Sequence, residues 1–127
     1  MASLLLVALG GAFGATLRYL LSGLISRYFE SAFPAGTLGV NLLGCFAVGL
    51  LWEPLAHTAL SPHVRTFFLI GVLGAFTTFS TYGIESVNLI RDGELRLALF
   101  NLFLSNVLGI ALVLLGLAIS RLASSAV

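Results

Sequence analysis

The chain has 127 residues, of which 59% are hydrophobic and only 9% are charged. Because a soluble domain carries about 25% charged residues, this composition indicates a protein that lives in a lipid bilayer. The net charge is +1 and all six basic residues are scattered arginines, so the sequence excludes a basic surface for nucleic acid. The single cysteine, Cys45, lies in an apolar run, and we interpret it as a buried small residue rather than a nucleophile or a metal ligand.

Four apolar stretches each have about the 20 residues that a helix needs to cross the hydrocarbon core of a membrane. They cover residues 3–24, 35–52, 66–88 and 97–120, and short connectors separate them. The first stretch lacks both a positively charged start and a small-residue cleavage site, so we interpret it as a retained span rather than a secretory signal. The sequence therefore predicts an all-α, multi-pass integral membrane protein, in which residues 1–127 form a single domain of four transmembrane helices.

The arginines at the ends of the spans barely distinguish the two sides of the membrane. A four-span topology puts Arg65 and Arg121 on one side, and the other side receives Arg27, Arg91 and Arg96. Since the side richer in arginine and lysine normally stays cytoplasmic, so small a difference favours dual topology, in which two opposed copies of the chain pair. Chance also produces such a balance in short loops, so the count alone leaves a single orientation open.

Four helices fill their own centre with side chains, so a pore needs a second copy of the chain or an interface between copies. We therefore predict a homodimer. Glycines recur in all four spans and let helices approach one another closely, either inside the chain or between copies. The glycines concerned are Gly10, Gly14, Gly36, Gly44, Gly49, Gly71, Gly74, Gly109 and Gly116.

The third span carries a cluster of hydroxyl side chains near its middle, in the segment GVLGAFTTFSTY at 71–82. In a regular helix these hydroxyls would bond back to their own helix. In a broken helix, main-chain amides and carbonyls would be freed at a depth where only a cavity or a binding site makes them tolerable. Four hydroxyls within five residues, preceded by two glycines, favour a break near the bilayer midplane. Amide ends at such a break would suit anions, and carbonyl ends would suit cations. The hydroxyl residues are Thr77, Thr78, Ser80 and Thr81.

Amide side chains interrupt the second and fourth spans. Asn41 lies in an apolar run, where unpaired polar atoms would cost on the order of a few kcal/mol. It either makes a structural bond between helices or donates to a permeating anion, and the residues leave both readings open. Asn101, Ser105 and Asn106 interrupt the fourth span, and the first two share a helix face. That face is either a polar track or a tie to a neighbouring helix.

Two aromatic and two charged side chains in the spans are further candidates. Phe79 and Tyr82 share a face of an intact helix; such rings usually pack in a core or against lipid, but a ring edge carries partial positive charge that suits a dehydrated anion. Arg18 lies within the first span. It is either a functional charge in the membrane or a side chain that snorkels to the interface. Glu85 lies near the end of the third span, as a mouth residue or an interfacial anchor.

The sequence does not indicate an enzyme. We expect His57 and His63 in a loop, without cysteines or carboxylates at metal-ligand spacing. The chain offers no nucleophile and base pair and no phosphate-binding glycine loop. A small four-helix, proton-coupled multidrug or cation exporter is the alternative, but it would need a carboxylate deep in a span, and Glu85 lies near an end. A membrane assembly subunit would explain the glycines but not the hydroxyl cluster.

Three blocks of the chain resemble the signature blocks of the Fluc (CrcB) family of fluoride channels. They read GGAFGATLRY at 10–19, GTLGVNLLGCFAVG at 36–49 and GVLGAFTTFSTY at 71–82, and the resemblance covers essentially the whole chain. It implies an antiparallel, dual-topology homodimer in the plasma (inner) membrane. Such a dimer would lower cytoplasmic fluoride by passive efflux through two pores.

The resemblance also implies roles for single residues. Asn41 would coordinate fluoride, and Phe79 would turn its ring edge to the ion. Backbone carbonyls of Gly74 and Thr77 from both subunits would hold a structural sodium ion at the dimer centre. Arg18 would line the mouth of the pore or have a structural role. From the residues alone, we expect the same of Glu85.

We expect the rest of the fluoride pathway to include Thr78, Ser80, Tyr82 and Ser105. Tyr82 stands where the family usually has a second phenylalanine, so either its ring edge or its hydroxyl would meet the ion. Asn101 stands where the family frequently has a tyrosine, which implies a wetter or differently tuned polar track beside Ser105.

Overall fold

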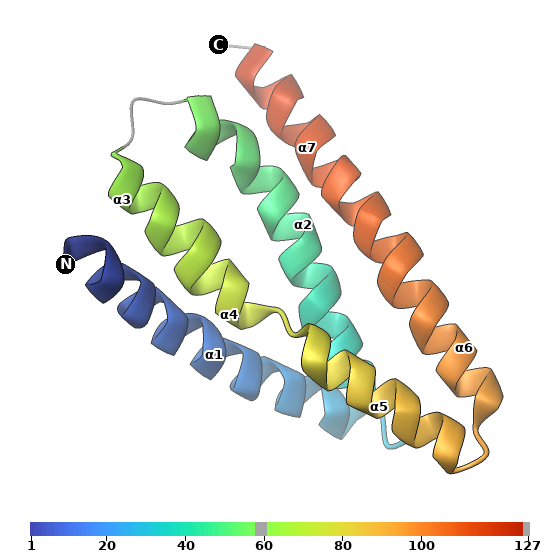
Figure 1. Cartoon of the computed structure of the whole chain (residues 1–127). Helices are drawn as coiled ribbons and strands as arrows, with labels where there is room; N and C mark the ends of the chain where they lie inside the picture. The colour runs from blue at the N-terminus through green and yellow to red at the C-terminus, as the bar shows by residue number, and fades with distance from the viewer. Residues whose placement is uncertain (58–60, 126–127) are drawn as a thin grey trace.

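The computed structural model describes residues 1–57 and 61–125, and in these ranges the chain is helical with short turns (Figure 1). Helix α1 covers Ala2–Tyr28 and α2 covers Ala35–His57. The third span is built from α3 (Pro62–Arg65), the π-helix η1 (Thr66–Leu73), α4 (Gly74–Phe76) and α5 (Phe79–Arg91). The fourth is built from α6 (Leu95–Phe103), the π-helix η2 (Leu104–Leu108) and α7 (Gly109–Ser125).

Within the described residues, four helical stretches are long and apolar enough to cross a membrane: Ala2–Tyr28, Ala35–Leu55, Pro62–Arg91 and Leu95–Ser125. The predicted all-α class and the four spans are thereby confirmed. Helices form here because lipid cannot hydrogen-bond the main chain, which must satisfy itself within each span. Helices α1 and α5 continue beyond the apolar stretches and carry Arg27 and Arg91 in their last turns. A positive charge is favourable there, because the carbonyl end of a helix carries partial negative charge.

The expectation that both histidines lie in a loop is wrong. His57 is the last residue of α2, and His63 lies in α3, which Pro62 starts at its first position. Proline suits that position because the missing N–H would have no partner in a helix's first turn. Ser3 on α1 is the nearest polar partner of His63, with Oγ 3.5 Å from Nδ1.

The start of α1 and the end of α7 lie at the same end of the bundle, and the turn between α5 and α6 lies at the other end (Figure 1). That turn depends on Gly93, whose φ of 81° is a left-handed conformation that glycine adopts without strain. Its N–H donates to Ile90 O at 3.1 Å, and the N–H of Glu94 donates to Leu89 O at 2.8 Å. This pair of bonds closes α5 and returns the chain along the bundle.

Two close helix contacts hold the bundle, one between α1 and η1 and the other between α2 and α7. A side chain at Gly14 would collide with the main chain of Val72, and one at Gly49 would collide with the main chain of Val113. These two glycines therefore serve packing inside the chain.

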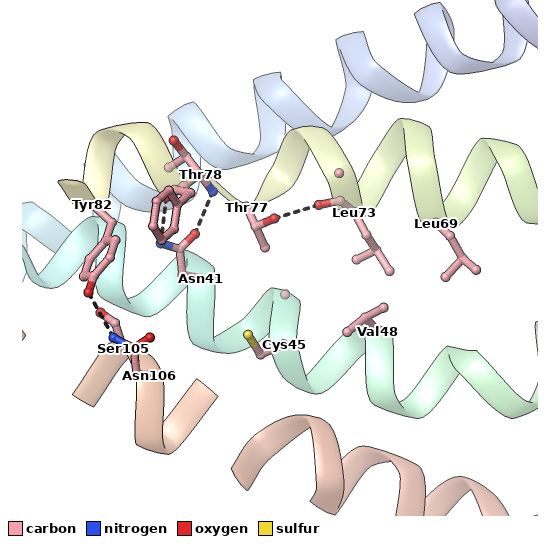
Figure 2. A pocket seen from close by; sticks show the side chains of 13 residues that line it. Asn41, Cys45, Val48, Leu69, Leu73, Thr77, Thr78, Tyr82, Ser105 and Asn106 are labelled. Carbon is pink, nitrogen blue, oxygen red and sulfur yellow. Dashed lines mark hydrogen bonds between the residues drawn. The ribbon is translucent and has the colours of Figure 1, made fainter. Parts of the chain in front are cut away.

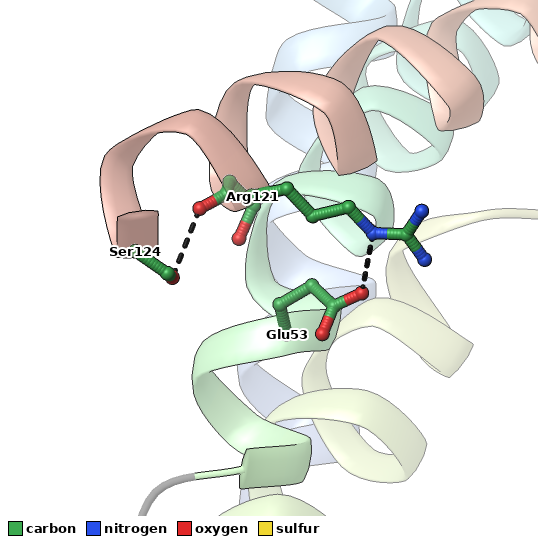
Figure 3. A network of polar contacts seen from close by, with 4 residues as sticks. Glu53, Arg121 and Ser124 are labelled. Carbon is green, nitrogen blue, oxygen red and sulfur yellow. Dashed lines mark hydrogen bonds and ion pairs between the residues drawn. The ribbon is translucent and has the colours of Figure 1, made fainter. Parts of the chain in front are cut away.

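At the end of the bundle where α1 starts and α7 ends, an ion pair also ties α2 to α7. Arg121 Nε donates to Glu53 Oε1 at 2.8 Å, beside the bond from Ser124 to Ser120 O (Figure 3).

Gly14→Ala should destabilise the fold by about 1–3 kcal/mol, because the added methyl group forces α1 away from η1. Gly23→Ala is the matched control. This glycine lies on the same helix, and a methyl group added there would meet nothing within 4 Å outside the backbone of α1. Thermal unfolding in detergent, followed by circular dichroism, measures both. Equal melting temperatures for the two variants would contradict this account of the helix contact.

Candidate functional site

A cavity of about 370 Å³ lies where the third span is interrupted (Figure 2). Its walls come from the third span itself (η1, α4 and the start of α5), from α2 and from η2. None of the 13 residues that line it carries a charge. The polar residues of the lining are Asn41, Thr77, Thr78, Tyr82, Ser105 and Asn106. A solute in this cavity therefore meets aliphatic side chains, aromatic rings, amides and hydroxyls but no charged group.

The backbone leaves the helical conformation for two residues. Thr77 has φ −89° and ψ 156°, and Thr78 has φ −146° and ψ 115°, both extended. A new helix, α5, then begins at Phe79. The hydroxyl of Thr78 caps it by accepting from Thr81 N at 3.2 Å, and donates to Thr81 Oγ1 at 2.9 Å. One hydroxyl, that of Thr78, thus caps the new helix.

The side chain of Asn41 on α2 clamps the interruption from outside. Its Nδ2 donates to Thr78 O at 3.0 Å, and its Oδ1 accepts from Thr78 N at 2.8 Å (Figure 2). Both main-chain groups of Thr78 are therefore satisfied by one amide from another helix. Of the two open readings of Asn41, the structural bond is present, and the second N–H of Nδ2 remains for another acceptor.

The same bonds leave main-chain carbonyls without their helical donors. In a regular helix, Thr78 N would donate to Gly74 O and Thr81 N would donate to Thr77 O. Here the first N–H bonds Asn41 and the second bonds the Thr78 hydroxyl. The carbonyls of Gly74 and Thr77 are thus released from the helix, while the side chain of Thr77 donates to Leu73 O at 3.2 Å.

Phe79 and Tyr82 line the cavity together, as their shared helix face predicts. Their ring centroids are 5.4 Å apart and the ring planes meet at 55°. Tyr82 is 8% exposed and belongs to the core, whereas Phe79 is 82% exposed in the single chain. Of the two rings on the lining, Phe79 is therefore the exposed one and Tyr82 the buried one.

Asn101 does not reach the cavity. It is 1% exposed, and its Nδ2 donates to Ser86 Oγ at 3.0 Å, which ties α6 to α5. Ser105 does line the cavity, and its hydroxyl lies 3.5 Å from Asn101 Oδ1. The shared face of these two residues is therefore both a tie between helices and, at its Ser105 end, a part of the polar lining.

Sequence reasoning gave no place in the pathway or the sodium site to six residues of the lining, among them Asn106 and Cys45. Asn106 had only been seen as an interruption of an apolar run, but it lies in η2 and donates from Nδ2 to the Tyr82 hydroxyl at 3.0 Å. Cys45, which we expected to be buried, is half-buried in the cavity wall. An amide in the middle of a span was the available signal for Asn106, whereas nothing in the sequence distinguished Cys45.

The other candidate residues lie outside the cavity. Ser80 is exposed, and its Oγ is 3.4 Å from Thr78 Oγ1. Glu85 accepts from Thr37 Oγ1 at 2.8 Å and lines a separate hollow of about 650 Å³ at the far end of α5. Arg18 is half-buried on α1 and is absent from both linings.

The chain is similar to known proteins over most of its length. The family model described as CrcB-like protein, Camphor Resistance (CrcB), matches residues 5–117. A protein named fluoride-specific ion channel FluC from Desulforapulum autotrophicum is 44% identical over 91% of this chain and 94% of its own length. Proteins of the same name are 45% identical in Maridesulfovibrio salexigens (93% of this chain, 94% of the relative) and 47% identical in Aquifex aeolicus (87% and 90%). Matches of this extent and identity show that the chain belongs to the CrcB-like protein family.

Proposed function

We propose that the chain forms a fluoride-selective channel that lowers cytoplasmic fluoride by passive efflux. One observation carries the proposal: the interruption of the third span opens onto a cavity whose uncharged walls combine apolar side chains with amides and hydroxyls. The relatives named fluoride-specific ion channels support the choice of ion. The channel is a transporter of ions and performs no enzymatic step.

Uncharged donors suit fluoride in particular. Fluoride is small, strongly hydrated and a strong acceptor, so a channel must replace its water with hydrogen-bond donors. The remaining N–H of Asn41 and the ring edge of Phe79 are such donors. Conduction also requires that the ion leave, and a fixed positive charge in the cavity would hold it. Thr78 and Ser105 on the lining, with Ser80 beside them, extend this pathway.

A proton-coupled exporter fits the cavity less well. Such a protein needs a carboxylate that exchanges a proton for its substrate within the membrane. No carboxylate lines the cavity, and Glu85 bonds Thr37 in a separate hollow. Glu85 and Arg18 are therefore assigned to the mouths of the channel or to its structure.

The working unit that we propose is an antiparallel homodimer of dual topology in the plasma (inner) membrane. In the single chain, polar or small residues in the middle of the spans are exposed, namely Gly74, Ser80 and Asn106. Lipid cannot hydrogen-bond such groups, so a second copy is the natural cover. The near-balance of arginines at the two ends of the bundle agrees with insertion in both orientations.

We also propose a structural sodium ion at the centre of this dimer. The carbonyls of Gly74 and Thr77 have lost their helical donors, and Gly74 is exposed on the face that the second copy would cover. Unwound carbonyls at a helix end are the ligands that membrane proteins use for sodium. When bound, the ion would balance the partial negative charge of these carbonyl oxygens.

Asn41→Leu should lower fluoride efflux about tenfold or more, because each unpaired main-chain group left at Thr78 costs about 1–3 kcal/mol. A fluoride electrode records efflux from liposomes that contain the purified protein, with chloride efflux measured in parallel. Asn88→Leu makes the same chemical change outside the cavity and should conduct normally. Unchanged efflux through Asn41→Leu would remove the clamp from the mechanism, and equal chloride flux in the unmodified protein would refute fluoride selectivity.

A small thiol reagent should block the channel through its only cysteine. Cys45 stands in the cavity wall, so an attached group would fill the space that the ion needs. We expect a loss of most fluoride efflux after treatment with methanethiosulfonate ethylammonium, reversed by a reducing agent. Cys45→Ala is the control, because it must lose the sensitivity; a modified protein that still conducts would place the pathway elsewhere.

Exchange of sodium for N-methylglucamine at constant ionic strength should lower both the share of dimer and the temperature of unfolding. A bound ion stabilises only the state that holds it, and the large organic cation cannot enter between carbonyls. Size-exclusion chromatography and thermal unfolding measure the two effects. Identical curves in both salts would count against the sodium site but not against the channel.

A further inference from the structure

The hydrogen bonds of Asn106 define which of its atoms faces Tyr82. Its Nδ2 lies 2.8 Å from Leu102 O and 3.0 Å from the Tyr82 hydroxyl oxygen. A carbonyl oxygen only accepts, so the atom beside Leu102 must be the nitrogen of the amide. The second N–H of the same nitrogen then points at Tyr82, and the phenol oxygen is the acceptor in this bond.

The proton of the Tyr82 hydroxyl is consequently left for another partner. Asn106 offers it no acceptor, and among the described residues no other group accepts from this hydroxyl. The side chain is 8% exposed and lines the cavity, with its hydroxyl next to Asn106 and Ser105 in Figure 2. A buried hydroxyl without an acceptor is unfavourable, so the cavity must supply one.

The bond from Asn106 also strengthens this donor. A hydroxyl that accepts a hydrogen bond is polarised and donates more strongly, and the low polarity of the surroundings adds to the effect. The geometry of η2 serves the arrangement, because this π-helical turn places the consecutive residues Ser105 and Asn106 on the cavity lining. Such turns occur frequently at functional sites.

From these contacts we propose that the Tyr82 hydroxyl donates a hydrogen bond to the anion in the cavity. Asn106 is the positioning residue that directs this hydroxyl toward the anion. The inference rests on the proposed fluoride channel and adds a residue and a donor to it. A hydroxyl favours a small, strongly accepting anion over a larger and weaker acceptor. Tyr82 therefore contributes to the preference for fluoride through its hydroxyl, not only through its ring.

A double-mutant cycle tests the proposal in liposomes that contain the full-length protein. Tyr82→Phe removes the hydroxyl and keeps the ring, and Asn106→Leu removes the orienting amide. Each should lower fluoride efflux about tenfold, the effect expected for one hydrogen bond to a charged group. The double variant should conduct no less than Tyr82→Phe alone, because Asn106 acts only through the hydroxyl. If Asn106→Leu does not fold, Asn106→Ala takes its place in the cycle.

A spectroscopic measurement separates positioning from a purely structural role. Binding of fluoride to the phenol hydroxyl should shift its near-ultraviolet absorption, and chloride at the same concentration should not. The shift should be absent in Tyr82→Phe and reduced in Asn106→Leu. Tyr19→Phe is the matched control, since this tyrosine is 78% exposed on α1, and the variant should keep the full shift.

The outcomes distinguish this inference from the proposed function. If the unmodified protein carries no fluoride, the proposed function fails and the inference fails with it. If the unmodified protein conducts and Tyr82→Phe conducts equally well, only the inference fails. An effect of Asn106→Leu that is as large in the Tyr82→Phe background as in the unmodified chain would likewise overturn the positioning role.

Discussion

The pairing of one side-chain amide with one residue's main chain supports the rest of the site. Asn41 satisfies both the N–H and the carbonyl of Thr78, at a depth where lipid offers neither donor nor acceptor. Without this pairing each group would be left unpaired at a cost of about 1–3 kcal/mol, and a continuous helix would be the better solution for the third span. The interruption therefore depends on a residue from a different helix, α2.

This pairing has consequences on both sides of the interruption. Upstream, the carbonyls of Gly74 and Thr77 lose their helical donors, because Thr78 N donates to Asn41 and Thr81 N donates to the Thr78 hydroxyl. Downstream, α5 begins at Phe79 and turns its amide end, with its partial positive charge, toward the cavity. One interruption thus offers oxygen ligands suited to a cation and N–H groups suited to an anion.

The frame that holds this site is built by close contact of main chains. α1 meets η1 through Gly14, and α2 meets α7 through Gly49, so the helix that carries Asn41 is fixed against its neighbours. Of the two polar residues that depart from the family resemblance, Tyr82 lies on the cavity wall and Asn101 is buried outside it. Where a tyrosine is frequent the chain has Asn101, which ties α6 to α5, and a phenol hydroxyl instead enters from α5 as Tyr82.

The sequence by itself determined the membrane environment and the four helices, and it favoured an interruption in the segment 71–82 of the third span. These follow from composition, from the length of the apolar stretches and from the crowding of hydroxyls after Gly74, all of which are local along the chain. It also marked Asn41 as a residue in need of a partner, but only the tertiary structure decided that the partner is Thr78. The direction of the Asn106 bond, the burial of Asn101 and the place of Cys45 in the wall were likewise decided by packing. Each depends on which helices lie side by side, and hydrophobic periodicity in a membrane span does not report that, because lipid and protein interior are equally apolar.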